Sequence, residues 1–198
     1  MAWIYGNRYL DADEMLNNAK IVQEYGLASG WSSNAICAIL GNMESESTIN
    51  PGIWESLDPY SGGYGLVQWT PYTKYSNWAG IGWQNNGDKQ LERIDWEAEH
   101  NEQWFYNSEI GQAPPYSFSE FLVDDTTPIA TMANYFLWFY EHPANPIQPA
   151  RGQQALAWYE ALDWDEPPGP GPEPPEPPEP EPRILWWILF KFKGRGVK

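Results

Sequence analysis

Apolar side chains recur at helical spacing between residues 33 and 47. Four of them are separated by three, one and three positions, which places them on one face of a helix. They are Ile36, Ile39, Leu40 and Met43. Ser32 or Ser33 is suited to cap the start of this helix, and the Asn50-Pro51 turn signal follows its end. The pattern predicts an apolar helix over about residues 33–47, around which the rest of the chain is organised.

The same periodicity, together with capping signals, predicts further helices. Asp11 and Glu14 have the spacing of a capping box at the start of the first one. In the last one, Leu156, Tyr159 and Leu162 fall on one face, which we expect to point inward. The predicted helices cover approximately residues 12–26, 33–47, 70–79, 88–106, 118–123, 128–141 and 150–162.

Few segments have the alternating pattern of a strand. Residues 48–70 are rich in glycine and turn-forming residues, so we expect a loop there, with a short hairpin around Gly62. In the helix over 88–106, Asp88 is expected to be the cap and Trp104 to face inward. The pattern as a whole predicts an all-α domain with a loop or short hairpin beside its cleft.

The composition changes abruptly after Trp164. Residues 166–182 are a Pro/Glu tract, which cannot form a helix or a packed core and favours an extended polyproline II spacer. At about 3.1 Å per residue, such a spacer spans on the order of 50 Å. We therefore expect a folded domain over residues 1–165, a linker over 166–182 and a hydrophobic-basic tail over 183–198.

The tail joins an uninterrupted apolar run, from Ile184 to Phe190, to interleaved basic residues. The run is far shorter than the roughly 20 residues that span a bilayer. Adjacent tryptophans flanked by cations suit a membrane interface. The same segment also suits a docking peptide that is buried in a partner subunit, or it has no function. The sequence leaves these three roles open.

Charge and aromatic content narrow the class of partner. The 198-residue chain has a formal net charge of −16, which argues against nucleic acid as a partner. Its 13 Trp and 12 Tyr indicate a folded domain with aromatic-lined surfaces. The N-terminus lacks the basic and apolar stretches of a signal peptide, so we expect none.

Carboxylates stand at the polar end of the central helix. Burial disfavours the charged form of a carboxyl, so an acid in such a place can hold a proton near neutral pH and donate it. Glu46 is the candidate general acid, and a solvated glutamate near a helix end is the ordinary alternative. Glu44 is two positions away and therefore on another face, so we expect it at the surface.

Two motifs together resemble a known family. The first, MESES, covers residues 43–47 and leads to an Ile-Asn-Pro turn, and the second, GYGLVQW, covers residues 63–69. They are similar to motifs of the phage tail lysozymes and, more distantly, of goose-type lysozymes and lytic transglycosylases. In those families a Glu-Ser pair precedes a Gly-Leu-x-Gln segment, here Glu46-Ser47 and residues 65–68. The resemblance covers roughly residues 12–160. It implies a lysozyme-like fold, cleavage of the glycan of bacterial peptidoglycan, and Glu46 as the acid.

A second carboxylate decides the mechanism. An inverting hydrolase needs two carboxyls about 6.5–9.5 Å apart, and a retaining one needs about 5–5.5 Å. Glu55 and Asp58 lie on the loop that returns toward the helix end, so either is a candidate, and each is alternatively an ordinary loop carboxylate. If neither reaches the cleft, a lytic transglycosylase is favoured, in which the 6-hydroxyl of the sugar attacks and leaves an anhydro sugar.

The glycine-rich loop supplies the candidate sugar-binding residues. Gln68 is expected to bond a sugar N-acetyl group or to position the acid, and Tyr64 and Trp69 to pack on sugar faces. Gly65 permits a close approach of the backbone, and Ser47 is placed to hydrogen-bond at the helix end. Ordinary loop packing is the alternative for each.

No pattern for a metal, a cofactor or a thiol nucleophile emerges. His100 and His142 lack metal-ligand spacing, and Cys37 is the single cysteine. We expect Cys37 to be a small buried hydrophobe and His142 to end a helix.

The resemblance therefore implies a muralytic glycosidase that needs no cofactor. Such a protein would be virion-associated or released to the host cell wall, for wall penetration or host lysis, and its tail would contact a membrane interface or a virion protein. The rival from another class is a non-catalytic wall-binding or structural tail protein that kept the fold.

Overall fold

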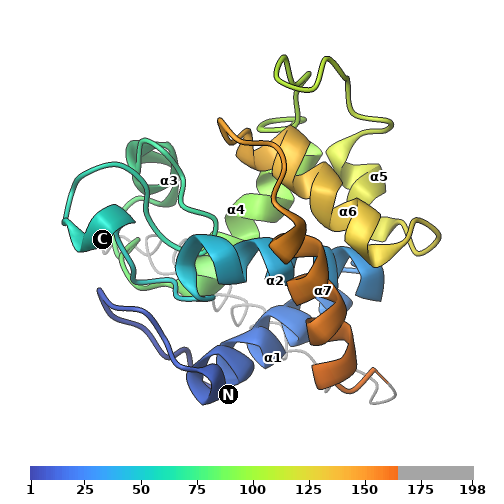
Figure 1. The fold of residues 1–198 in the computed structure, drawn as a ribbon. Helices are drawn as coiled ribbons and strands as arrows, with labels where there is room; N and C mark the ends of the chain where they lie inside the picture. The colour runs from blue at the N-terminus through green and yellow to red at the C-terminus, as the bar shows by residue number, and fades with distance from the viewer. Residues whose placement is uncertain (165–198) are drawn as a thin grey trace, which may run out of the picture.

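The computed structural model describes residues 1–164, and helices form nearly all of their regular structure. Within these residues β-pairing is confined to isolated bridges, two of them in the 54–69 segment. The predicted all-α fold is confirmed. The elements in chain order (Figure 1) are α1 (Ala12–Ala28), α2 (Ser33–Ser47), the 3-10 turn η1 (Glu55–Leu57), α3 (Thr73–Ala79), α4 (Gly87–Glu99), α5 (Phe118–Val123), α6 (Ile129–Phe136), the π-turn η2 (Leu137–Glu141) and α7 (Pro149–Ala161).

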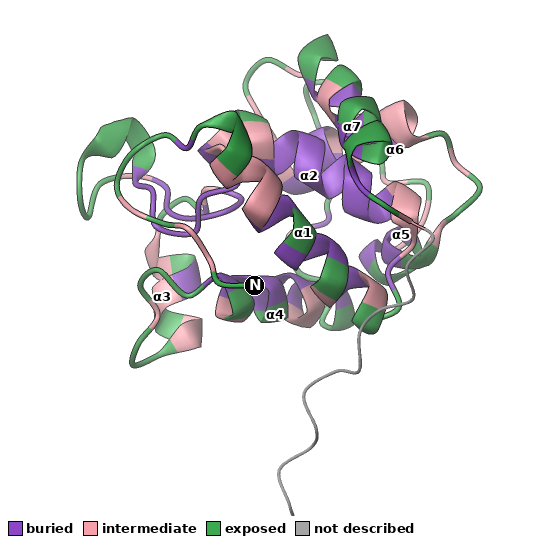
Figure 2. Cartoon of the chain, turned by 90° about the horizontal axis from the view of Figure 1, so that it is seen from below, coloured by how far each residue is buried: buried purple, intermediate pink, exposed green. Residues whose placement is uncertain are grey.

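The central position of α2 follows from its sequence. Every residue from Ala35 to Met43 is buried, so the helix is covered around its whole circumference rather than along one stripe (Figure 2). Ser32 caps its start by accepting a hydrogen bond from the Ala35 amide, and Thr48 ends it in the left-handed conformation with φ 54°. The helices α1, α5, α6 and α7 contact it, whereas its last turn is only partly buried.

The N-terminal arm, residues 1–10, is held against the end of α2. The predicted capping box of Asp11 and Glu14 begins α1. The side chain of Asn50, from the turn after α2, donates to the carbonyl oxygens of Gly6 and Arg8 at 2.8 and 2.6 Å. Asn50, part of the predicted turn after α2, therefore also holds the N-terminal arm in place.

The helix α7 lies directly on α2 because a glycine lets the two backbones approach. A Cβ atom on Gly41 would lie 2.5 Å from the carbonyl oxygen of Arg151 and 2.7 Å from the nitrogen of Ala155. The predicted inward face of this helix was wrong in part. Leu162 is buried, but Leu156 and Tyr159 are exposed, and the residues that face the core are Arg151, Gly152, Ala155 and Trp158.

The helix predicted over 88–106 ends earlier, at Glu99. Its cap is Asn86, whose side chain accepts from the Lys89 amide, and not Asp88. Positive φ angles of 53° at Asn101 and 57° at Gln103 turn the chain away from the helix. Trp104 is buried as predicted, but from a segment outside the helix.

The helix predicted over 128–141 exists but changes character in its last turn. α6 is followed by the π-turn η2, and His142, in the left-handed conformation with φ 51°, ends it as predicted. π-turns widen a helix locally and re-aim the side chains that they carry. This one carries Tyr140 and Glu141.

The predicted linker and tail over 166–198 lie outside the described residues. Among residues 1–164, no helix has both the length and the apolar character needed to cross a membrane. Cys37 is fully buried, as expected, and burial raises the pKa of its thiol to about 12.

Candidate active site

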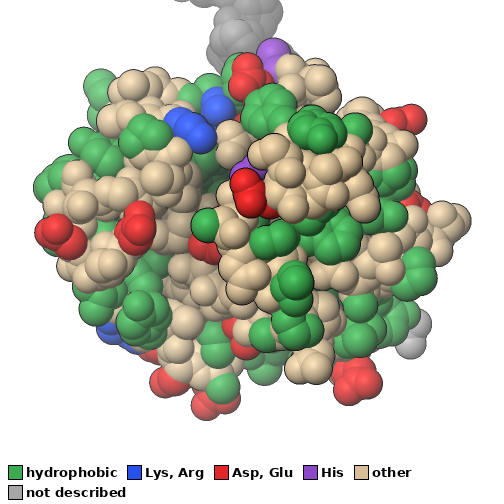
Figure 3. All heavy atoms as spheres, turned by 45° about the horizontal axis from the view of Figure 1, so that its top comes forward, with side chains coloured by type: hydrophobic (Ala, Val, Ile, Leu, Met, Phe, Trp, Pro, Cys, Tyr) green, Lys and Arg blue, Asp and Glu red, His purple; other side chains and the backbone are tan. Residues whose placement is uncertain are grey.

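One face of the molecule is hollowed (Figure 3), and a cavity of about 630 Å³ opens there. This volume is within the range of about 300–1,000 Å³ that is usual for ligand sites. Acidic and aromatic side chains line it. They come from the arm, the end of α2, the 53–70 loop, α3, and the segments after α4 and around η2. The lining residues that could bind or act on a ligand are Tyr9, Glu46, Trp54, Glu55, Gln68, Trp69, Lys74, Gln103, Phe105, Tyr140, Glu141 and His142.

Glu46 projects into this cavity from the last turn of α2. Its side chain is 22% exposed, and its Oε1 accepts a hydrogen bond of 2.5 Å from the guanidinium of Arg151. Glu44 points elsewhere, as predicted from its helical phase: it accepts from the indole nitrogen of Trp158 at 2.8 Å and does not line the cavity. The helix thus presents one of its two terminal glutamates to the cleft.

Arg151, from the first turn of α7, holds Glu46 in place. Its guanidinium also donates to Oδ1 of Asn42 at 3.0 Å and to Oε1 of Gln148 at 2.9 Å. Asn42 and Glu46 are one helical turn apart, so a single planar group contacts both and restricts the Glu46 side chain. The sequence pattern did not indicate Arg151, because it is 105 positions from Glu46 and lies in no motif.

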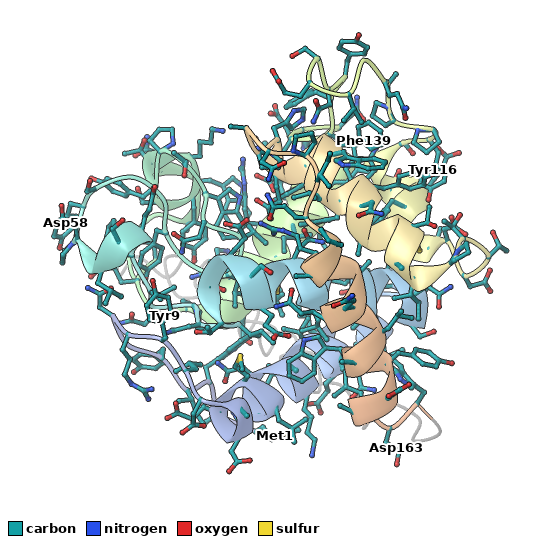
Figure 4. All side chains as sticks on the ribbon, in the orientation of Figure 1. Met1, Tyr9, Asp58, Tyr116, Phe139 and Asp163 are labelled. Atoms are coloured by element: carbon teal, nitrogen blue, oxygen red, sulfur yellow. The ribbon has the colours of Figure 1, made fainter. Side chains whose placement is uncertain are left out.

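The two loop carboxylates, predicted as candidates for the second carboxyl, are placed differently. The chain folds back around Gly62 as predicted, since the amide of Glu55 donates to the Gly63 carbonyl at 3.0 Å. Glu55 lines the cavity, and its carboxylate accepts from the Gly63 amide at 2.7 Å. Asp58 is exposed at the outer edge of the molecule (Figure 4) and is not among the residues that line the cavity.

The loop that carries the second motif, residues 63–69, is called the motif loop. Hydrogen bonds with neighbouring residues hold its shape. The hydroxyl of Ser47 donates to the Leu66 carbonyl at 2.8 Å, which joins the end of α2 to the loop. Gly65 has a φ of 81°, and a Cβ there would collide with Gln90. The side-chain nitrogen of Gln68 donates to the Gly65 carbonyl at 2.9 Å. Of the three, Gln68 lines the cavity, whereas Ser47 and Gly65 support it from behind.

The two aromatic residues of the motif loop, Tyr64 and Trp69, differ in whether they line the cavity. Tyr64 is 1% exposed and does not line the cavity; its hydroxyl accepts from the Asn85 amide at 2.7 Å. Trp69 lines the cavity and stacks on Tyr75, with 5.0 Å between ring centroids. Trp54, which the sequence pattern did not indicate, also lines the cavity and packs its ring 4.6 Å from that of Tyr64.

Beneath the cavity, Glu97 of α4 connects two of its lining segments. It accepts hydrogen bonds from the Trp69 indole at 3.1 Å and from the Tyr140 hydroxyl at 2.5 Å. Arg93, one turn earlier, donates to it at 2.9 Å. Burial raises the pKa of Glu97, and these hydrogen bonds and the charge of Arg93 oppose the rise. The network fixes Trp69 relative to Tyr140, although they are far apart in sequence.

Glu141 is a further carboxyl of the cavity that the sequence pattern did not indicate. It is partly buried, and its Oε1 has no hydrogen-bond partner within the described chain. Burial raises the pKa of Glu141 well above its usual value, and the charge of Glu46 raises it further. A Glu-His-Pro sequence at a helix end gives no signal beyond that of a helix stop. In residues 1–164, no group of three or more His, Cys, Asp or Glu is arranged to hold a metal ion.

With this geometry established, comparison with known proteins decides the family. The phage tail lysozyme family matches residues 17–162. The chain belongs to the phage tail lysozyme family. Morphogenesis protein 1 of Bacillus phage B103 is 48% identical to it over 164 residues, which cover 79% of this chain and 42% of that protein. The chain therefore spans less than half the length of this relative.

The family match includes almost the whole cavity. α2, the motif loop, η2 and α7 all lie within residues 17–162. Tyr9, on the arm, is the cavity-lining residue outside this range. The likeness to phage tail lysozymes and the position of the cavity thus concern the same part of the molecule.

Proposed function

We propose that this phage tail lysozyme is a muralytic glycosidase that cleaves the MurNAc-GlcNAc bond of bacterial peptidoglycan, with Glu46 as general acid. The observation that carries the proposal is the position of Glu46. It is the acid of the family's Glu-Ser pair, and it projects into a cavity of sugar-binding size with its rotamer restricted by Arg151. Aromatic side chains, which suit the flat faces of sugars, line the same cavity.

The proposed chemistry begins with proton donation to the glycosidic oxygen, so that the bond to C1 can break. A general acid must hold a proton when it acts, so the chemistry depends on how Glu46 obtains one. In a hydrolase, a second carboxylate then activates water or stabilises the sugar cation. Of the two loop candidates, Glu55 is favoured over Asp58 because it lines the cavity. Without such a carboxylate, the alternative is a lytic transglycosylase acting on the same bond.

Gln68, Trp69 and Trp54 are the proposed substrate contacts, since each lines the cavity. Ser47, Tyr64 and Gly65 are proposed to act indirectly, by setting the shape of the loop. This division predicts that sugar binding depends more on the first group.

Replacing Glu46 tests the assignment. Glu46→Gln keeps the size of the side chain and its contact with Arg151 but removes the ionisable proton, so release of soluble muropeptides should fall by at least about 10²-fold. Glu44→Gln is the matched control on the same helix. Its amide oxygen still accepts from Trp158, and it lies outside the cavity, so activity should remain at the wild-type level. Equal activity of both folded variants would remove Glu46 from the mechanism.

The setting is proposed to be the virion, for penetration of the host wall. The similarity to a phage protein whose name denotes morphogenesis supports this, and release during host lysis is the alternative. The 166–182 tract would act as a spacer, and the 183–198 tail would contact a virion protein or a membrane interface. The non-catalytic rival predicts a protein that pellets with peptidoglycan but releases no soluble glycan.

A further inference from the structure

Glu141 lies outside both family motifs, yet it lines the same cavity as Glu46. It is the last residue of the π-turn η2, a kind of turn that is frequent at functional sites. Its Oε1 is buried and has no hydrogen-bond partner among the described residues. A buried, unpartnered oxygen is far more costly on a carboxylate than on a neutral carboxylic acid. The geometry therefore favours the neutral acid at this position.

Charged groups from three helices act on Glu141. Burial raises its pKa, the charge of Glu46 on α2 raises it further, Arg151 on α7 lowers it, and Glu97 on α4 raises it. Arg93 on α4 forms an ion pair with Glu97, with 2.9 Å between its Nε and the carboxylate. The other ionisable side chains that line the cavity are Tyr9, Glu55, Lys74, Tyr140 and His142.

Two carboxyls that line the cavity, those of Glu46 and Glu141, are thus under the influence of one cation in this corner of it. Arg151 is in contact with Glu46, and its charge also acts on Glu141. Two carboxylates would leave the partly buried corner with an excess negative charge, whereas one carboxylate and one carboxylic acid are balanced by the single guanidinium. Neighbouring carboxyls in this situation titrate as a pair.

We propose that Glu141 and Glu46 share one proton, which Glu141 holds in the free protein and passes to Glu46 when substrate binds. The inference rests on the proposed glycosidase function and adds a source for the proton that Glu46 donates. Glu141 thereby acts through Glu46, and Arg151 compensates the charge of whichever carboxyl has lost the proton.

The proton follows a closed path through the reaction. Protonated Glu46 donates to the glycosidic oxygen, the bond from that oxygen to C1 breaks, and the electron pair stays on the oxygen. Water, or the sugar's own 6-hydroxyl in a transglycosylase, adds to C1 and gives one proton to the carboxylate pair. The pair then holds a single proton again. Where Glu55 instead activates the water as a base, Glu55 takes this proton and releases it to solvent, and the pair regains one proton from solvent.

The protonation of Glu141 can be tested in the free protein, independently of activity. We would label the glutamate side-chain carboxyls with ¹³C in the full chain, assign Glu141 by its absence from Glu141→Gln, and titrate it by NMR. We expect Glu141 to be protonated at pH 7. In Glu46→Gln, which removes a negative neighbour, its midpoint should fall by about one pH unit or more. An ionised Glu141 at pH 5, or an unchanged midpoint in Glu46→Gln, would overturn the proposal.

The second measurement is the pH profile of kcat/KM for wild type, Glu141→Gln and the control Glu44→Gln. Glutamine retains the shape of a neutral carboxylic acid but has no proton to transfer, so a purely structural Glu141 would be replaced with little loss. Proton sharing instead predicts a loss of about 10²-fold and the disappearance of one limb of the profile. Wild-type rate and profile in folded Glu141→Gln would refute proton transfer.

The two measurements separate the possible failures. If wild type releases no glycan but Glu141 titrates as expected and responds to Glu46→Gln, the proposed function is wrong and the shared proton stands as a property of the cavity. If wild type is active and the titration fails, the glycosidase assignment stands and this inference is wrong.

Discussion

At the scale of single residues, the site depends on a contact between the ends of two helices. Glu46 is the last glutamate of α2, and Arg151 is in the first turn of α7. Because Arg151 is planar and also contacts Asn42, it fixes the Glu46 side chain in a way that the single point charge of a lysine would not. The position of the acid in the cavity is therefore determined by side chains far from it in sequence.

The sequence revealed one member of this group and not the others. Glu46 could be predicted because its helix is apolar and its Glu-Ser pair has a partner motif some twenty residues later. Arg151 and Glu141 could not, because nothing in the local pattern tells a buried arginine or glutamate from an exposed one. Their roles arise from the packing of α7 and η2 against α2.

A surface ion pair near the cavity gives a pH-dependent prediction. The two terminal guanidinium nitrogens of Arg8 donate to the carboxylate of Glu14, at 2.6 and 2.7 Å, beside the cavity-lining Tyr9. The hydrogen bonds of Arg8, and then that of the Asp11 amide, lower the pKa of Glu14 to about 2. Since the folded pKa is lowered, the stabilisation is present above the unfolded pKa of about 4.3 and is lost as pH falls through the folded value.

In Arg8→Gln, the NMR titration midpoint of Glu14 should therefore rise toward the ordinary value, with part of the shift kept by the Asp11 amide. The stability difference between wild type and Arg8→Gln should shrink between about pH 4 and pH 2. An unchanged Glu14 midpoint in the variant would show that Arg8 is not its partner in solution.

At the scale of elements, the approach of α7 to α2 is what brings Arg151 to Glu46. Gly41 makes this approach possible, because the backbone of α7 occupies the space in which a side chain would lie. A glycine within a helix ordinarily costs about 1 kcal/mol relative to alanine. Its presence in the middle of α2 thus reflects packing against α7.

The variant Gly41→Ala distinguishes helix propensity from packing, because the two effects change the free energy of unfolding in opposite directions. Propensity alone would stabilise it by about 1 kcal/mol, whereas overpacking against α7 should destabilise it by about 1–3 kcal/mol. We expect destabilisation in urea unfolding and reduced activity, since Arg151 is displaced with α7. Ser45→Ala removes only an exposed hydrogen bond from the same helix to Gln154 of α7, so it should cost about 0.5 kcal/mol, at the lower end for a hydrogen bond. A stabilised Gly41→Ala would contradict the close packing.

The elements themselves were more predictable than their orientation. Caps and apolar periodicity gave α1, α2 and α5 nearly to the residue. The predicted inward face of α7 was wrong in part, because small residues and an arginine, rather than Leu156 and Tyr159, fit against α2. The end of α4 was wrong because Trp104 continues the apolar pattern from an extended segment. Burial of a tryptophan does not by itself require a helix.

At the scale of the whole molecule, the cavity is assembled from segments that the chain brings together only on folding. The motif loop lies on one side of α2 and the α5–α6 region on the other (Figures 1 and 2). Glu97 connects them from beneath by accepting from both Trp69 and Tyr140. The fold could be predicted from the sequence, but this connection could not, because it joins three separate elements through one buried carboxyl.

The most direct test of the account is mass spectrometry of the soluble products that the 198-residue chain releases from purified peptidoglycan. We predict muropeptides with new glycan ends from wild type and Glu44→Gln, and at least about 10²-fold less from Glu46→Gln. Reducing ends would identify a hydrolase and make Glu55 the next residue to replace, and anhydro-muramic ends would identify a transglycosylase. A folded wild-type protein that binds peptidoglycan and releases no glycan product would contradict the central claim.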